Sequence, residues 1–446
     1  MTNTVKEVLA FVRENDVKFI RLSFCDLTGT QKNISIMPDD LEHAFESGIS
    51  FDASSILGFS DVTKSDLFLV PDPGTLRLMP WRPQQGRVIR FYCDIINPDQ
   101  TPFAFDTRRV LKEAVRRCEQ AGYACNIGAE CEFYLFKTDE QGDPTQIPLD
   151  TGSYLDISPL DKGENVRREI CLCLEEMGIK PETSHHEQGP GQNEIDFKYS
   201  DPLSSADNVL SFRSVVKAIA AQNGLFASFL PKPIPDRSGS GFHINLSLIS
   251  DGLNLFRHAF PAEHRIPGVQ LWAAESFIAG IMEQTAFMTA FLNPIANSYE
   301  RFGSFEAPQY ISWSCQNRSQ LIRIPAATGE KTRMELRSPD PAVNPYLAFA
   351  LILHAGMDGI EHRAVLPPPV NENMYTASPD LLGSVPRLPD NLGMALSLAA
   401  GSSFVKKALG DSLVEKYIHI KQKEADAYAA AEDKHAFVCR HFFRQI

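Results

Sequence analysis

Charged and polar side chains recur at every second position in three short segments, and their types are those that hold metal ions and phosphate groups. In an extended strand, side chains two positions apart share one face and lie roughly 7 Å from each other. The segments are GAECEFYLF (128–136), GSGFHINLSL (239–248) and RMELRSPDP (333–341), and their polar faces carry Glu130, Glu132, His243, Asn245, Ser247, Arg333, Glu335 and Arg337. Each polar face is either a solvated sheet surface with ordinary ion pairs or part of a site that binds metal ions or phosphate groups.

A fourth segment also carries paired acids. HHEQGPGQNEIDF (185–197) holds Glu187 and Glu194 on either side of a Gly-Pro-Gly turn. A turn of this kind folds the chain back, so the two carboxylates return towards each other. Two neighbouring carboxylates repel unless they share a cation. The alternative is a polar surface loop.

Taken together, the four segments offer the ligands of a hard divalent cation. They supply five carboxylates and one imidazole, namely Glu130, Glu132, Glu187, Glu194, Glu335 and His243. Oxygen-rich ligation of this kind suits Mg²⁺ or Mn²⁺ rather than a structural zinc ion. Four arginines, whose guanidinium forks match phosphate and carboxylate groups, lie close together in the chain at Arg318, Arg323, Arg333 and Arg337. The residue types therefore predict a phosphoryl-transfer site.

The elements that must position these side chains form a mixed α+β protein. Alternation predicts a strand over 17–25, and 64–94 holds further strand-like pieces divided by Pro and Gly. A helical pattern over 108–122 follows a loop. We therefore expect a small β-rich domain at 1–104 and a larger domain at 105–446, whose helices and short strands follow no regular βαβ order.

The composition excludes several classes of protein. The 446 residues carry a formal charge of −13, without the basic surface that nucleic-acid binding requires. No apolar run reaches the 18 or so residues that span a bilayer, and the amphipathic N-terminal segment is not a targeting signal. The nine cysteines include no CxxC pair, which favours reduced thiols in the cytoplasm. We expect no nucleic-acid partner and no membrane partner.

Eight segments, in order along the chain, resemble bacterial type I glutamine synthetases. Besides GAECEFYLF and HHEQGPGQNEIDF they are FDASSILGF (51–59), SDLFLVPDP (65–73), GSGFHINLSL (239–248), NPIANSYERFGSFEAP (293–308), NRSQLIRIP (317–325) and RMELRSPDPAVNPYLAF (333–349). The resemblance implies an N-terminal β-grasp domain and a catalytic domain with a curved antiparallel sheet and flanking helices. It also implies a dodecamer of two stacked hexamers, with each active site built between neighbouring subunits.

The same resemblance implies the reaction: ATP-dependent ligation of ammonia to L-glutamate through γ-glutamyl phosphate, giving glutamine, ADP and phosphate. It implies two Mg²⁺ ions per site, with Mn²⁺ possible. By resemblance, the ligands of one ion are Glu132, Glu187 and Glu194, and those of the other are Glu130, His243 and Glu335.

Further roles are implied residue by residue. The nucleotide contacts are expected at Glu182, Asn245, Ser247, Arg318, Arg323 and Arg333, and the glutamate contacts at Gly239, Arg301, Glu306 and Arg337. Asp52, contributed by a neighbouring subunit, resembles the carboxylate that deprotonates ammonium. Glu306 resembles the flap carboxylate that shields the acyl phosphate from water, and Arg318 would steady the transferred phosphoryl group.

The chain also departs from the family pattern. The flap RFGSFE is one residue shorter than usual, Glu300 replaces a usual Lys, and the segment 249–291 is longer than in compact relatives. One alternative is a γ-glutamyl ligase for a polyamine or another amine on the same fold, although Asp52, Ser55 and Glu306 favour ammonia. Another is a catalytically dead relative, which the presence of all six metal ligands argues against.

Overall fold

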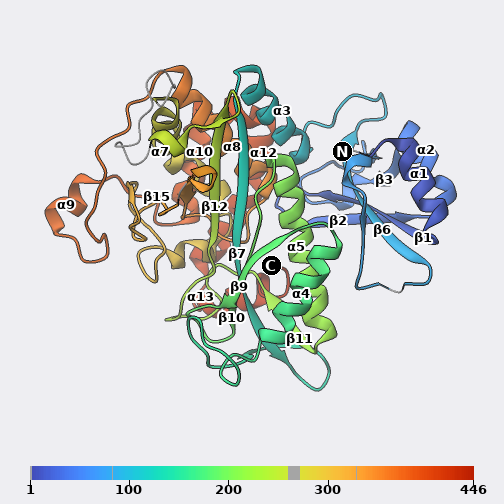
Figure 1. Ribbon diagram of the computed structural model, residues 1–446, viewed down its shortest axis with the longest axis horizontal. Coiled ribbons are helices and arrows are strands. Elements are labelled where there is room, and N and C mark those ends of the chain that lie inside the picture. Colours follow the sequence, from blue (N-terminus) through green and yellow to red (C-terminus); the bar gives the residue numbers. More distant parts are fainter. Residues whose placement is uncertain (1–2, 83, 260–271, 328) are drawn as a thin grey trace.

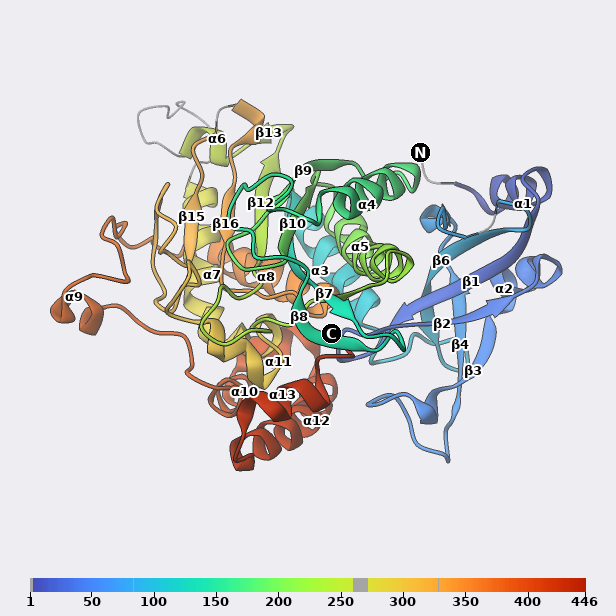
Figure 2. The ribbon, with the colours of Figure 1, turned by 90° about the horizontal axis from the view of Figure 1, so that it is seen from below.

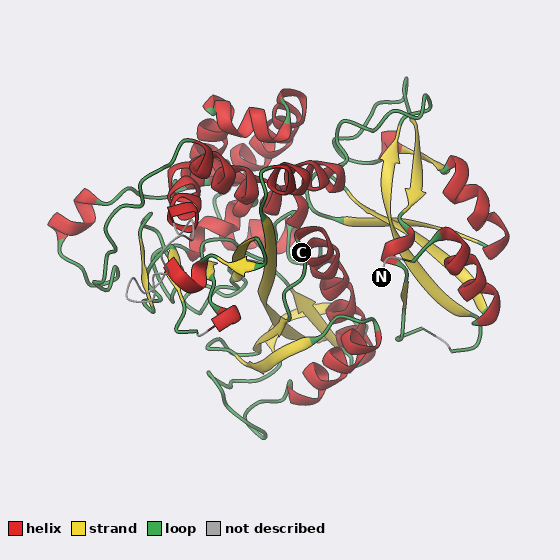
Figure 3. Ribbon diagram, turned by 45° about the horizontal axis from the view of Figure 1, so that its top comes forward, coloured by secondary structure: helices red, strands yellow, loops and turns green. Residues whose placement is uncertain are grey.

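The computed structural model describes residues 3–82, 84–259, 272–327 and 329–446. The chain forms two bodies, each with its own sheet, and helices lie between the two sheets (Figures 1 and 3). The part of the expected 249–291 insertion that spans 260–271 lies outside the described residues.

The smaller body is an N-terminal mixed sheet in the order β2-β1-β6-β4-β3, with β5 beside β6. Its elements are α1 (Val5–Glu14), β1 (Val17–Cys25), β2 (Gln31–Ile36), α2 (Leu41–Ser47), β3 (Ile49–Asp52), β4 (Asp66–Pro71), β5 (Arg77–Leu78) and β6 (Arg87–Ile96). Strands β1 and β6 are parallel, and their inward side chains, among them Ile20, Leu22, Ile89 and Phe91, are fully buried. The predicted small β-rich unit is confirmed.

The larger body is built on a second sheet in the order β14-β15-β16-β12-β7-β10-β9, with β8 and β11 beside β7 and β13 beside β12. Its strands are β7 (Ala124–Thr138), β8 (Pro144–Pro148), β9 (Pro181–His186), β10 (Gln192–Phe197), β11 (Leu225–Ser228), β12 (Phe242–Ser250), β13 (Leu253–Asn254), β14 (Trp313–Cys315), β15 (Ile322–Ile324) and β16 (Met334–Leu336). All three segments with alternating polar residues contain strands, as predicted, and the structure places these strands in one sheet.

The larger body also contains helices. They are α3 (Thr107–Gln120), α4 (Glu164–Glu176), α5 (Pro202–Gln222), α6 (Phe256–Ala259), α7 (Trp272–Leu292), α8 (Pro345–Glu361), α9 (Pro379–Ser384), α10 (Leu392–Gly401), α11 (Ser403–Leu409), α12 (Asp411–Ala430) and α13 (Lys434–His441). Of these, α5, α3 and α4 contact the strands of the second sheet. The fully buried side chains of Cys131, Phe133 and Leu135 in β7 join α5 in one hydrophobic core. This packing fixes the apolar face of β7 and leaves Glu130 and Glu132 on the other face.

Helix α8 is apolar almost all round because it lies inside this core, beside α7 and α3. Across the described residues, no helix combines the length and the apolar character needed to cross a membrane. All nine cysteines are described, and each is a free thiol.

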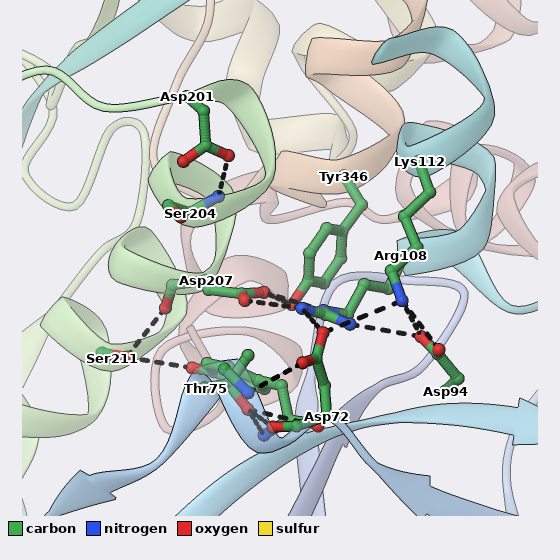
Figure 4. A network of polar contacts seen from close by, with 12 residues as sticks. Asp72, Thr75, Asp94, Arg108, Lys112, Asp201, Ser204, Asp207, Ser211 and Tyr346 are labelled. Carbon is green, nitrogen blue, oxygen red and sulfur yellow. Dashed lines mark hydrogen bonds and ion pairs between the residues drawn. The ribbon is translucent and has the colours of Figure 1, made fainter. Parts of the chain in front are cut away.

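A buried ion network joins the two bodies (Figure 4). Arg108 of α3 contacts Asp207 of α5 at 3.0 Å, Asp72 at 3.0 Å and Asp94 of β6 at 3.2 Å. The Tyr346 hydroxyl donates to Asp207 at 2.6 Å. The guanidinium group of Arg108 thus holds carboxylates from both bodies, and so fixes the N-terminal sheet against α3 and α5.

Candidate active site

A polar cavity of about 710 Å³ lies on the face of the large sheet opposite the hydrophobic core. Strands β7, β12 and β10 present their polar side chains to it, and loops that carry arginines line the rest. The predicted residues that line it are Glu130, Glu132, Glu187, Glu194, Gly239, His243, Arg301, Glu306, Arg318, Arg323, Arg333 and Arg337. The structure therefore brings together residues that lie far apart in the sequence.

One acidic group forms where β7, β12 and β16 meet. Glu130 is directly opposite His243 in the β7–β12 ladder, and His243 Nδ1 lies 3.2 Å from Glu130 Oε2 and 3.6 Å from Glu335 Oε1. One potential ligand atom from each of the three residues lies within 4.8 Å of the others. These three residues are one of the two predicted ligand sets.

A second acidic group lies on the β9–β10 hairpin. Here one ligand atom each from His185, Glu187 and Glu194 lies within 4.8 Å of the others. Glu132 is directly opposite Glu194 in the ladder, but its Oε2 accepts hydrogen bonds from Gln192 Nε2 at 2.6 Å and from the Gly241 N–H at 3.0 Å. The predicted set is thus gathered on one hairpin and its neighbouring strand, and His185 is an additional candidate ligand.

The acids of the site carry strongly perturbed pKa values. Burial, with the nearby charge of Glu187, raises the pKa of Glu132 to about 8. Burial, together with Asp196 and Glu132, raises the pKa of Glu194 well above its usual range. Burial also opposes ionisation of Glu130, but hydrogen bonds from His243 and Asn245 outweigh it and hold its pKa at about 2. Several buried carboxylates gathered this closely favour a bound cation.

The donor set fits divalent metal binding. Burial lowers the pKa of His243, and the charge of Arg337 adds to this effect; both favour the neutral imidazole, whose lone pair can bind a metal ion. The remaining donors of the two groups are mostly carboxylate oxygens, which suit Mg²⁺ or Mn²⁺. The arrangement can therefore hold two cations on adjacent parts of one sheet face.

Arginines surround the acids. The fully buried Arg337 donates from Nη1 to Glu335 Oε1 at 2.5 Å, and Arg323 Nη1 lies 2.7 Å from Glu335 Oε2. Glu306 lies 3.7 Å from Arg337 and 3.8 Å from Arg318. These guanidinium groups can receive phosphate or carboxylate oxygens of a substrate.

Arg301 approaches the cavity beside Gly239. Its Nη1 donates to the Ser338 carbonyl at 2.8 Å, which holds the buried guanidinium in place. A Cβ at position 239 would lie 2.4 Å from Arg301 Cγ and 2.5 Å from the Pro231 carbonyl, so only glycine fits there. Glu300, which replaces a usual Lys, instead accepts a hydrogen bond from Tyr428 of α12.

A second cavity of about 270 Å³ adjoins the first and shares Glu130, Asp196 and Arg333 with it. The predicted residues Glu182, Asn245 and Ser247 line this smaller cavity. Arg333 Nε donates to Asn245 Oδ1 at 2.8 Å, and Asn245 Nδ2 donates to Glu130 at 2.8 Å. This chain of hydrogen bonds connects the two cavities.

Asp52 lies elsewhere in the chain. It ends β3 in the N-terminal sheet, on the opposite side of the molecule from β15 and β16 (Figures 1 and 2), and does not line either cavity. Hydrogen bonds from Ser54, first from its hydroxyl and then from its backbone N–H, lower the pKa of the Asp52 carboxyl, and the side chain is exposed. Within one chain, Asp52 cannot reach the acidic groups.

Several residues of the cavities were not predicted. Asp196 lines both cavities, and burial, with the charge of Glu130, raises its pKa to about 7. It follows Glu194 by two positions, so strand alternation could have identified it. Tyr154 and Gln192 also line the larger cavity. Gln192 precedes Glu194 by two positions on β10, so the same alternation could have identified it, whereas Tyr154 lies outside the alternating segments.

Comparison with known proteins decides the family. The model of the glutamine synthetase catalytic domain matches residues 104–438, and that of the glutamine synthetase β-grasp domain matches residues 16–98. The chain belongs to the glutamine synthetase family. The expected fold, a β-grasp domain with a catalytic domain, is thereby confirmed, and the protein is a ligase of this family.

Relatives resemble this glutamine synthetase family member over nearly its whole length. A glutamine synthetase of Clostridium saccharobutylicum is 47% identical, covering 95% of this chain and 96% of the relative. One of Methanosarcina mazei is 46% identical, covering 96% and 95%. Among solved structures, a GmaS/ADP complex has a TM-score of 0.85 at 29% identity, covering 99% of each chain.

Proposed function

We propose that this enzyme ligates ammonia to L-glutamate with hydrolysis of ATP, giving glutamine, ADP and phosphate. The observation that carries the proposal is the placement of two acidic groups on one sheet face, with arginines around them and a second cavity alongside. Acids that hold divalent cations beside guanidinium groups are the components of phosphoryl transfer.

In this proposal the nucleotide lies in the smaller cavity, with its phosphates directed into the larger one. Asn245, Ser247 and Glu182 contact the nucleoside, because they line a cavity that opens towards the acidic groups. Arg333, which lines both cavities, holds the phosphate chain where they join, and Arg323 and Arg318 receive the transferred phosphoryl group.

Glutamate then occupies the larger cavity. Arg301 and Arg337 bind its carboxylates, with the Gly239 backbone beside them, and its γ-carboxylate attacks the γ-phosphorus. Glu130, His243 and Glu335 would hold one Mg²⁺ or Mn²⁺ ion, and Glu132, Glu187 and Glu194 the other. Such ions neutralise phosphate charge and orient the carboxylate that attacks. Phosphorylation converts a poor leaving group into a good one, which ammonia displaces.

The amine site needs a second copy of the chain. Asp52 is exposed at the end of β3, the edge strand of the N-terminal sheet, and lines neither cavity of its own chain, which supports its donation to a neighbouring subunit. We propose a dodecamer of two stacked hexamers, with Asp52 accepting the ammonium proton and Glu306 closing the flap. Residues 1–104 and 105–446 are the two domains, and the nine free thiols support a cytoplasmic location.

A second candidate is a γ-glutamyl ligase that uses an organic amine. The likeness to GmaS, a γ-glutamylmethylamide synthetase, favours methylamine as the alternative substrate. The test measures phosphate release with ATP, glutamate and either ammonium, methylamine or putrescine. We expect turnover with ammonium to exceed that with either organic amine, and Asp52→Asn to lower it. Turnover confined to methylamine or putrescine would establish the second candidate.

A further inference from the structure

We infer that Asp150 and His186 position the hairpin that carries Glu187 and Glu194. This inference rests on the proposed metal site and extends it to residues behind the hairpin. Neither residue lines the larger cavity, and both are buried. They act through the backbone of the hairpin and are positioning residues rather than ligands.

Asp150 collects donors from three separate places in the chain. Its Oδ1 accepts from His186 Nε2 at 2.9 Å, from the Gly191 N–H at 2.9 Å and from the Gly152 N–H at 3.2 Å. Its Oδ2 accepts from the Lys162 N–H at 2.9 Å. One carboxylate therefore ties the turn between β9 and β10 to the loop that connects β8 with α4.

His186 carries this restraint to the metal-binding turn. While Nε2 contacts Asp150, Nδ1 lies 2.6 Å from the backbone carbonyl oxygen of Glu187. The ring thus spans from a buried carboxylate to the main chain of a proposed ligand. A Cβ at position 152 would lie 2.8 Å from His186 Nε2, so a glycine there is what lets the loop approach the ring.

Arg167 of α4 supports the other strand of the hairpin. It donates to Asp161 at 2.5 Å and to Asn193 Oδ1 at 2.6 Å, and Asn193 Nδ2 donates to the Gly191 carbonyl at 2.9 Å. Asn193 immediately precedes Glu194, so the position of that ligand is restrained from behind as well.

Asp150, Asp161 and His186 form a third group whose ligand atoms lie within 4.8 Å. These acids already have partners, because Arg167 contacts Asp161 and four donors surround Asp150. Strand alternation also separates the two histidines of β9: His185 Nε2 lies 3.7 Å from Glu194 in the site, whereas His186 turns away from it. The geometry fits support of the metal site rather than an additional metal.

The test is Mn²⁺ binding to the full-length, metal-free protein, with unbound Mn²⁺ counted by its electron paramagnetic resonance signal. Partners behind metal ligands typically change affinity by about 10–100-fold. We expect His186→Gln to weaken one of the two Mn²⁺ sites per chain by about that factor and to leave the other unchanged. Asp150→Asn should weaken the same single site. This variant replaces His186→Gln in the test if His186→Gln does not fold.

Two further variants make the outcome specific. His354→Gln is the matched control, because His354 contacts Arg117 on the helices and lines neither cavity; it should change neither Mn²⁺ affinity. Glu194→Gln removes a proposed ligand and should weaken the same site as His186→Gln.

If only Glu194→Gln weakens a site, the positioning role is wrong and the metal site stands. Equal weakening of both sites by His186→Gln also overturns the positioning role. If Glu194→Gln changes nothing, the ligand assignment fails, and the positioning role fails with it.

Discussion

Glu132 and Glu194 lie directly opposite each other on the neighbouring antiparallel strands β7 and β10, and both side chains are buried. Like charges at directly opposed positions destabilise a sheet, and burial adds a further cost to each carboxylate. Burial, with the neighbouring acids, accordingly raises the pKa of both residues. The fold thus places repelling groups where a cation would relieve the repulsion, and this gives the first prediction.

Glu194→Gln should stabilise the metal-free protein while abolishing turnover. On folding without metal, Glu194 must either be buried as a charge opposite Glu132 or take up a proton against its usual pKa, whereas Gln needs neither but cannot serve as the proposed ligand. We expect an increase of about 1 kcal/mol in the free energy of unfolding. Thermal unfolding in EDTA and phosphate release with Mg²⁺ measure the two effects. Glu119→Gln, an exposed acid of α3, is the control and should change neither. A less stable metal-free Glu194→Gln protein would contradict the prediction.

Glu335→Ala should have the opposite effect on stability, although it too should abolish Mg²⁺-dependent activity. Glu335 is buried between Arg337 at 2.5 Å and Arg323 at 2.7 Å, so its removal leaves both guanidinium groups without this partner. Breaking a buried ion pair costs about 3–5 kcal/mol. Chemical denaturation without metal should therefore show a lower midpoint than the wild type. Near-normal turnover of a folded Glu335→Ala protein would refute the metal assignment.

Glu306→Ala should uncouple phosphate release from glutamine formation. Phe305 and Glu306 both adopt left-handed backbone conformations, with φ of 48° and 62°, and Glu306 reaches towards Arg318 and Arg337. Without the carboxylate that closes this flap, water should reach the acyl phosphate more often. The ratio of phosphate to glutamine should rise from about one in the wild type to well above one. An unchanged ratio with lower turnover would instead indicate a role in binding alone.

Arg108→Met should destabilise the contact between the two bodies of the chain. Arg108 is buried among Asp72, Asp94 and Asp207, and the methionine would leave these carboxylates with fewer partners (Figure 4). We expect a loss of about 3–5 kcal/mol, measured by chemical denaturation. The adjacent Arg109→Met is the matched control. Arg109 makes a partly exposed i,i+4 pair with Glu113, so the loss there should stay below about 1 kcal/mol.

Asp106 should make stability fall as pH rises from about 4 to about 7. Burial, with the charge of Asp94, raises the pKa of this carboxyl from 3.8 to about 6. The folded state holds this proton more tightly than the unfolded state does. Protonated Asp106 therefore stabilises the fold fully below about pH 4, and this stabilisation is lost as pH rises through about 6. Asp106→Asn lacks this contribution. The difference in unfolding free energy between wild type and variant should therefore change by on the order of 2 kcal/mol between pH 4.5 and 7.5. A constant difference would contradict the assignment.

Much of the site could be predicted from the sequence, because side chains alternate along a strand. Glu130 and Glu132 had to share a face with each other, and so did His243, Asn245 and Ser247, as soon as these segments formed strands. The same rule could have identified Asp196, two positions after Glu194. The roles of Arg301 and Asp52 have no such origin: neither stands in an alternating charged segment, and both were inferred from resemblance alone.

The sequence by itself therefore determined which side chains share a strand face and which chemistry their types allow. Only the tertiary structure decided which of them meet across strands. Glu130 faces His243 and Glu132 faces Glu194 because the hydrogen-bonded register between distant strands is set by the packing of the whole sheet on α5 and its neighbours. Alternation has a period of two along one strand and contains no information about its partner. For the same reason, only the fold revealed Asp150 and His186 behind the hairpin and the separation of Asp52 from the cavity of its own chain.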